Sequence, residues 1–104
     1  MARMLVIYKT PKDPAAFDKH YFEVHVPLAK KLPGLRQYEV SRGPIVAPAG
    51  GSDFYRVGSL RFDSLAAIRD AFATPEGQAC GADRRRFAPN DEDVIMLLFD
   101  DREV

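Results

Sequence analysis

Segments with the patterns of strands and of helices follow one another in an order that restricts this chain to few folds. Apolar and β-branched residues predict strands over residues 3–9, 35–42, 54–62 and 94–99. Asp13 is a suitable helix cap and Pro14 fits a first turn, so a helix is expected to begin there and to end at Pro33. Ser64 and Thr74 are the expected caps of two further helical segments, the second ending near residue 87. The expected order is therefore β-α-β-β-α-β.

This order predicts an α+β fold with a four-stranded antiparallel sheet. With right-handed crossovers it gives the ferredoxin-like arrangement, in which both helical regions cover the same face of the sheet. A chain of 104 residues is expected to form one domain over residues 1–104. The strand at 94–99 then lies at an edge of the sheet.

That last strand predicts a partner. Its sequence, Val-Ile-Met-Leu-Leu-Phe, is apolar on both faces, and such an edge promotes aggregation unless it is covered. The sheet face without helices needs cover too, because broad apolar patches are rare on monomers. The loop at 43–52 and the C-terminal tail are one possible cover. We favour a symmetric homodimer in which the two sheets face each other, since it covers both surfaces at once.

Composition excludes several classes of function. Fifteen basic and fifteen acidic residues balance, so nothing predicts binding to nucleic acid or to a membrane. The run Arg84 to Arg86 is expected to be a solvated helix end, matched by acidic residues that follow it. No apolar stretch is long enough to span a membrane or to act as a signal peptide. Cys80 is the only cysteine and is expected to be an inert thiol, which favours a reducing, cytoplasmic location.

Both histidines lie on the first helix, and they are the leading candidates for chemistry because histidine changes charge near neutral pH. The expected buried stripe of this helix is formed by apolar residues spaced four, three and four apart, namely Phe17, Tyr21, Val24 and Leu28. On an ideal helix His20 and His25 lie about 140° apart, so they are not expected to share a face. Pro27 should interrupt the helix near His25.

Two roles are open for these histidines. The interruption could turn His25 towards an apolar pocket, where burial would keep it neutral and able to act as a general base or acid. Alternatively, His25 could bond a free carbonyl at the broken helix. His20 is a weaker catalytic candidate. Asp13 is expected to act as a cap. Around the pocket, the candidate ligand-binding residues are aromatic: Tyr8, Tyr21 and Phe17.

The same residues carry a resemblance. The run from Tyr8 to Pro14, followed by Phe17, His20-Tyr21, His25-Val26-Pro27-Leu28 and Pro33-Gly34, resembles the EthD family. This family is named for a protein encoded with a cytochrome P450 system that degrades ethyl tert-butyl ether. The resemblance implies two ferredoxin-like subunits that pair into a dimeric α/β barrel. Similar barrels include polyketide cyclases, muconolactone isomerases, cofactor-free monooxygenases and haem-degrading enzymes, so the fold alone does not choose a reaction.

Three functions follow from these considerations, and whether the protein is an enzyme is left open. The first is an EthD-like protein of oxidative catabolism or secondary metabolism that binds a small apolar or aromatic molecule and transfers a proton without a cofactor, as an isomerase, cyclase or monooxygenase. Members of the family are often labelled reductases or oxidoreductases, but the sequence has no glycine-rich loop that would hold a nucleotide cofactor. The second function is a non-catalytic accessory protein of an ether degradation pathway. The third is haem binding through a helical histidine. No metal-ligand motif is present.

Overall fold

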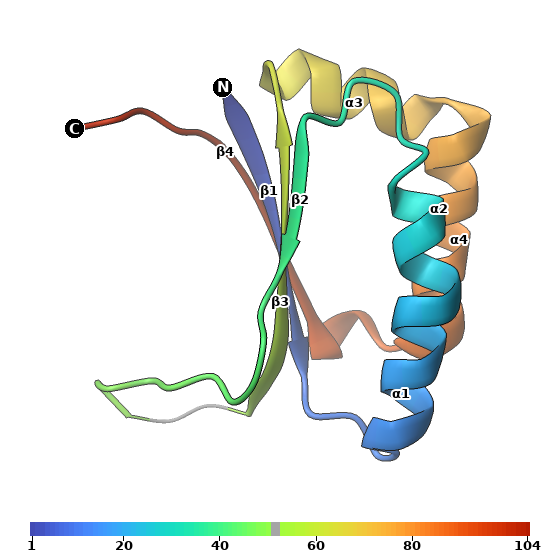
Figure 1. Cartoon of the computed structure of the whole chain (residues 1–104), viewed down its shortest axis with the longest axis vertical. Helices are drawn as coiled ribbons and strands as arrows, with labels where there is room; N and C mark the ends of the chain where they lie inside the picture. The colour runs from blue at the N-terminus through green and yellow to red at the C-terminus, as the bar shows by residue number, and fades with distance from the viewer. Residues whose placement is uncertain (51–52) are drawn as a thin grey trace.

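The four strands form one antiparallel sheet, and the helices lie against one of its faces (Figure 1). In this computed structural model, residues 1–50 and 53–104 are described, so the last two residues of the expected loop at 43–52 lie outside the described residues. The strands are β1 (Ala2–Lys9), β2 (Gln37–Val40), β3 (Phe54–Phe62) and β4 (Val94–Asp100), in the order β2-β3-β1-β4. This order confirms the expected ferredoxin-like α+β fold and places β4 at an edge.

The helices begin where the sequence predicts caps. The first helical region comprises α1 (Pro14–His20), a π-helical turn η1 (Tyr21–His25) and α2 (Val26–Ala29), and the second comprises α3 (Leu65–Ala73) and α4 (Pro75–Phe87), followed by a short 3₁₀ turn η2 (Asp91–Asp93). The side chains of Asp13, Ser64 and Thr74 each accept a hydrogen bond from a backbone N–H of the first turn that they cap. The three predicted caps are therefore confirmed.

Successive side chains of each strand point to opposite faces of the sheet. In β1, the residues that face the helices are buried: Ala2, Met4, Val6 and Tyr8. Side chains of the opposite face come from Leu5 and Ile7 of β1 and from their partners Leu97 and Ile95 of β4. Leu97 is 46% exposed, so these apolar side chains of β1 and β4 form a patch on the open side of the sheet, away from the helices (Figure 1).

The first helical region differs from its predicted pattern. Val24, expected to be buried, is 39% exposed, while His25 and Ala29 are buried. The π turn contains one residue more than an α-helical turn, so the buried face moves on by one position along the sequence. The regular α-helical pattern is thus interrupted near Pro27, as predicted, but by a widened turn and not by a break.

Two further predictions were wrong in detail. Leu65, expected in the core, is 40% exposed, since it lies in the first turn of α3 and the buried positions of that helix are Ile68 and Ala71. Arg84, expected on a solvated helix end, is buried; it donates hydrogen bonds to the Ala88 carbonyl oxygen and the Asp91 carboxylate. Among the described residues, no helix is long and apolar enough to cross a membrane.

Candidate functional site

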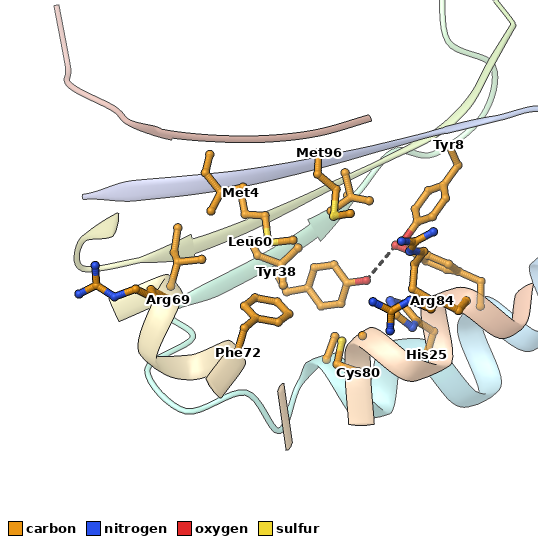
Figure 2. A pocket seen from close by; sticks show the side chains of 18 residues that line it. Met4, Tyr8, His25, Tyr38, Leu60, Arg69, Phe72, Cys80, Arg84 and Met96 are labelled. Carbon is orange, nitrogen blue, oxygen red and sulfur yellow. Dashed lines mark hydrogen bonds between the residues drawn. The ribbon is translucent and has the colours of Figure 1, made fainter. Parts of the chain in front are cut away.

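A cavity of about 420 Å³ lies between the helical face of the sheet and the helices (Figure 2). Its walls are mainly apolar: Met4, Val6, Leu60, Ile68, Phe72, Met96 and Leu98. Figure 2 shows Tyr38 reaching into the middle of this space, with Tyr8, His25 and Arg84 grouped at one end and Arg69 at the other. The cavity therefore combines an apolar body with a few polar groups, as small-molecule sites usually do.

The π turn places both histidines beside the same residue of α4. The backbone N–H of Val26 donates to the carbonyl oxygen of Tyr21, five residues earlier. Such a turn contains five residues, so it brings His20 and His25, which are five apart, to the same side of the helix. The expectation that the two histidines cannot share a face was wrong, because it assumed regular α-helical geometry.

Asp83 of α4 is the residue that they share. Its Oδ1 lies 2.8 Å from His20 Nε2 and its Oδ2 lies 3.0 Å from His25 Nδ1. Asp83 and His25 are buried, whereas the His20 side chain is 30% exposed. An ionised carboxylate can only accept hydrogen bonds, so each of these two ring nitrogens donates to it. The other nitrogen of a neutral His25, Nε2, then carries a lone pair.

The surroundings of His25 favour that neutral form. Burial lowers the pKa of His25, and this effect outweighs the opposing hydrogen bond and charge of Asp83. Phe87 packs against the His25 ring with their centroids 4.7 Å apart, and it also contacts the His20 ring. A buried, neutral imidazole that is oriented by a carboxylate and lines a cavity has the features of a general base.

A pair of tyrosine hydroxyls forms the second polar feature of the cavity. The oxygens of Tyr21 and Tyr38 lie 2.8 Å apart, and burial raises the pKa of both side chains, so both stay protonated at neutral pH. Only one of the two O–H groups is used in the bond between them, which leaves the other free to donate to a ligand oxygen. Gly58 provides space here, since a Cβ at this position would lie 3.2 Å from the Tyr21 oxygen.

The other predicted site residues are distributed over two pockets. Tyr8 lines the cavity and also a second, neighbouring pocket of about 480 Å³. Phe17 and His20 line that second pocket, and Phe17 packs edge to face against Tyr8. Cys80 lines the cavity, where burial raises the pKa of its thiol to about 11, consistent with an inert thiol.

Sequence reasoning missed three residues of the site. Asp83 was not singled out, and its local sequence, directly before three arginines, gives no signal that it contacts the histidines of the first helical region. Tyr38 was noted only among the four tyrosines, and Gly58 gave no signal beyond being a glycine within a strand, which often marks a close approach. Among residues 1–50 and 53–104, no group of three or more His, Cys, Asp or Glu side chains could hold a metal ion.

Comparison with known proteins agrees with this fold. The sequence model of the EthD domain matches residues 9–91. The chain belongs to the EthD family. A Rhodococcus erythropolis relative, an uncharacterized 11.0 kDa protein in the thcB-thcC intergenic region, is 36% identical over 103 residues, covering 99% of this chain and 96% of its own. The crystal structure of an ethyl tert-butyl ether (EthD) family protein from Bacillus halodurans is 34% identical, with a TM-score of 0.87, covering 98% of this chain and 99% of its own.

More distant structures share the fold. Hydroxynitrile lyase from Passiflora edulis is 17% identical to this EthD protein, with a TM-score of 0.74, over 99% of this chain and 94% of the lyase. SnoaB, a cofactor-independent oxygenase from Streptomyces nogalater, is also 17% identical, with a TM-score of 0.68, over 99% of this chain and 94% of SnoaB. At this level of identity the likeness concerns the fold alone.

Proposed function

We propose that this EthD protein binds a small apolar or aromatic molecule with one oxygen function and removes a proton from it without a cofactor. The observation that carries the proposal is the His25–Asp83 pair at the polar end of an apolar cavity, with the Tyr21–Tyr38 hydroxyl pair lining the same space. Two of the distant structures that share the fold belong to enzymes, one of them an oxygenase that needs no cofactor.

Each polar group has a role in this chemistry. His25 Nε2 takes a proton from an activated C–H or O–H group of the ligand, and Asp83 stabilises the imidazolium that forms. The free tyrosine O–H donates to the ligand oxygen as negative charge develops on it, so the product of the step is an enolate or phenolate. Isomerisation, cyclisation or reaction with oxygen can each follow from such an anion.

The direct test uses 2-tetralone, an apolar bicyclic ketone with acidic C–H groups beside a single carbonyl. NMR spectroscopy in D₂O follows exchange of those hydrogens for deuterium. The wild-type protein should accelerate the exchange, and His25→Ala should lose about 10²–10⁴-fold of that acceleration, the usual contribution of a general base. Val46→Ala is the control, because Val46 is exposed and lies outside the cavity lining.

Two other outcomes would replace the proposal. Saturable binding of 2-tetralone with no exchange would favour the non-catalytic accessory protein of an oxidative pathway, in which the same cavity only holds a ligand. A Soret band after addition of haem, lost in His25→Ala, would favour a haem protein.

The same proposal includes a homodimer in the cytoplasm. The open sheet face carries apolar side chains of β1 and β4, and a second copy of that face is a self-complementary cover for it. The lone buried thiol of Cys80 suits a reducing compartment.

A further inference from the structure

The two histidines contact one carboxylate from different environments. His25 contacts Oδ2 of Asp83 from the cavity, and His20 contacts Oδ1 from the second pocket. The His20 side chain is 30% exposed, while those of His25 and Asp83 are 8% and 3% exposed. One buried negative charge is thus shared by an imidazole that water reaches and an imidazole that water hardly reaches.

We propose that His20 is a positioning residue that shares Asp83 with His25 and takes the positive charge that this three-residue unit gains when the pH falls. His25 then remains the neutral imidazole with Nε2 available to the cavity. The catalytic meaning of this arrangement rests on the proposed function, whereas the order in which the two histidines take up protons does not.

The order follows from charge and solvation. A single carboxylate compensates a single imidazolium, so the second proton that enters the unit meets a charge that is already neutralised. Both Asp83 and water stabilise the imidazolium form of His20, whereas His25 has little contact with water. The first positive charge therefore belongs on His20, and its presence opposes a second charge on His25.

Other charged groups near the unit leave Asp83 as the deciding partner. The pocket of His20 is lined by three cations and two anions, namely Lys9, Lys12, Arg86, Asp13 and Asp93. The titratable and charged residues that line the cavity of His25 are Tyr8, Tyr21, Tyr38, Cys80, Arg69, Arg84 and Arg85. Burial raises the pKa of the thiol and of the three tyrosines, so these four groups are neutral at the relevant pH. The guanidinium of Arg84 is paired with Asp91, and the positive charges of the other two arginines oppose a charge on His25.

The test is an NMR titration of the two imidazole rings without any ligand. In the wild-type protein, His20 should take up its proton at higher pH than His25. In His20→Gln, the amide can still donate a hydrogen bond to Asp83 but carries no charge, so Asp83 should now stabilise the His25 imidazolium alone. The pKa of His25 should rise by about one pH unit, a change of the size that environments cause for histidine in folded proteins.

Lys19→Gln is the matched control, because it removes a positive charge from the exposed residue next to His20 without a contact to Asp83. It should leave the His25 titration nearly unchanged. The inference is overturned if His25 becomes charged before His20 in the wild type, if its pKa is unchanged or lower in His20→Gln, or if Lys19→Gln has an equal effect. The order of titration in the wild-type protein tests the inference even if His20→Gln does not fold.

The titration tests the shared carboxylate and the exchange assay tests the proposed reaction, so one can fail while the other succeeds. If His25 titrates as expected but the wild-type protein exchanges no hydrogen of 2-tetralone, the shared carboxylate stands and the proposed reaction does not. If exchange is catalysed, His20→Gln should retain activity at high pH and lose it on acidification at a higher pH than the wild type does. A residue that only held the fold together would lower activity at every pH instead.

Discussion

At the scale of single residues, the site depends on burial changing the behaviour of ordinary side chains. His25 is surrounded by Tyr21, Phe87 and Asp83, and the loss of water around it has the largest effect on its protonation. The same burial keeps the hydroxyls of Tyr21 and Tyr38 protonated. These effects have consequences for stability because the unfolded chain does not experience them.

We predict that His25 contributes a decrease in the free energy of unfolding when the pH falls from 7.5 to about 5.5, a range around the ordinary histidine pKa of about 6.5. The folded-state pKa of His25 is lowered, so over this range His25 binds a proton more readily in the unfolded chain, and its protonation favours unfolding. Asp63 and Asp101, whose pKa values are also lowered, lose their stabilising effect only in more acidic solution. Urea unfolding at several pH values measures the slope.

His25→Gln is the comparison for this prediction, since the amide does not titrate. The variant should show a smaller slope over the same pH range, whatever its absolute stability. An equal slope in the two proteins would mean that His25 is not the group responsible.

At the scale of elements, the π turn decides which residues of the first helix face the core. Most of the fold could be predicted from the sequence: the caps at Asp13, Ser64 and Thr74, the four strands and their order. The α-helical spacing failed at Val24 because the position of one extra residue in a turn depends on packing against α4 and the sheet, which local sequence does not report. For the same reason the link from Asp83 to both histidines, 58 and 63 residues away in sequence, could not be foreseen.

Because the π turn moves the buried face of this helical region on by one residue, two substitutions on it should have very different effects on stability. Val24→Lys should change the free energy of unfolding by no more than about 0.5 kcal/mol, as is usual for exposed positions. Ala29→Lys should destabilise the protein by several kcal/mol, because it places a charge in the core without a partner. Regular α-helical spacing would bury Val24 instead. Equal destabilisation by the two substitutions, measured by urea unfolding, would contradict the observed face.

At the scale of the whole molecule, the helices cover one face of the sheet and leave β4 exposed at an edge (Figure 1). The four central apolar residues of β4 are between 37% and 49% exposed: Met96, Leu97, Leu98 and Phe99. They serve two surfaces, since Met96 and Leu98 line the cavity, while Leu97 is paired with Leu5 on the open face. One short strand thus bounds the ligand site on one side and the proposed dimer interface on the other.

This division makes the dimer testable without disturbing the cavity. We expect the wild-type protein to sediment as a dimer at micromolar concentration. Leu97→Lys places a charge on the open face, where a second sheet would bury it unpaired, so this variant should give monomers or aggregates. Val24→Lys is the matched control, because it changes a similarly exposed apolar residue to lysine on the helical side. It should remain dimeric.

A monomeric wild-type protein, or a Leu97→Lys variant that dimerises as tightly as the wild type, would show that something else covers this face. Exchange of 2-tetralone hydrogens by a monomeric Leu97→Lys variant would further show that one subunit contains the complete site, as expected from a cavity lined by His25, Tyr21 and Tyr38 of the same chain.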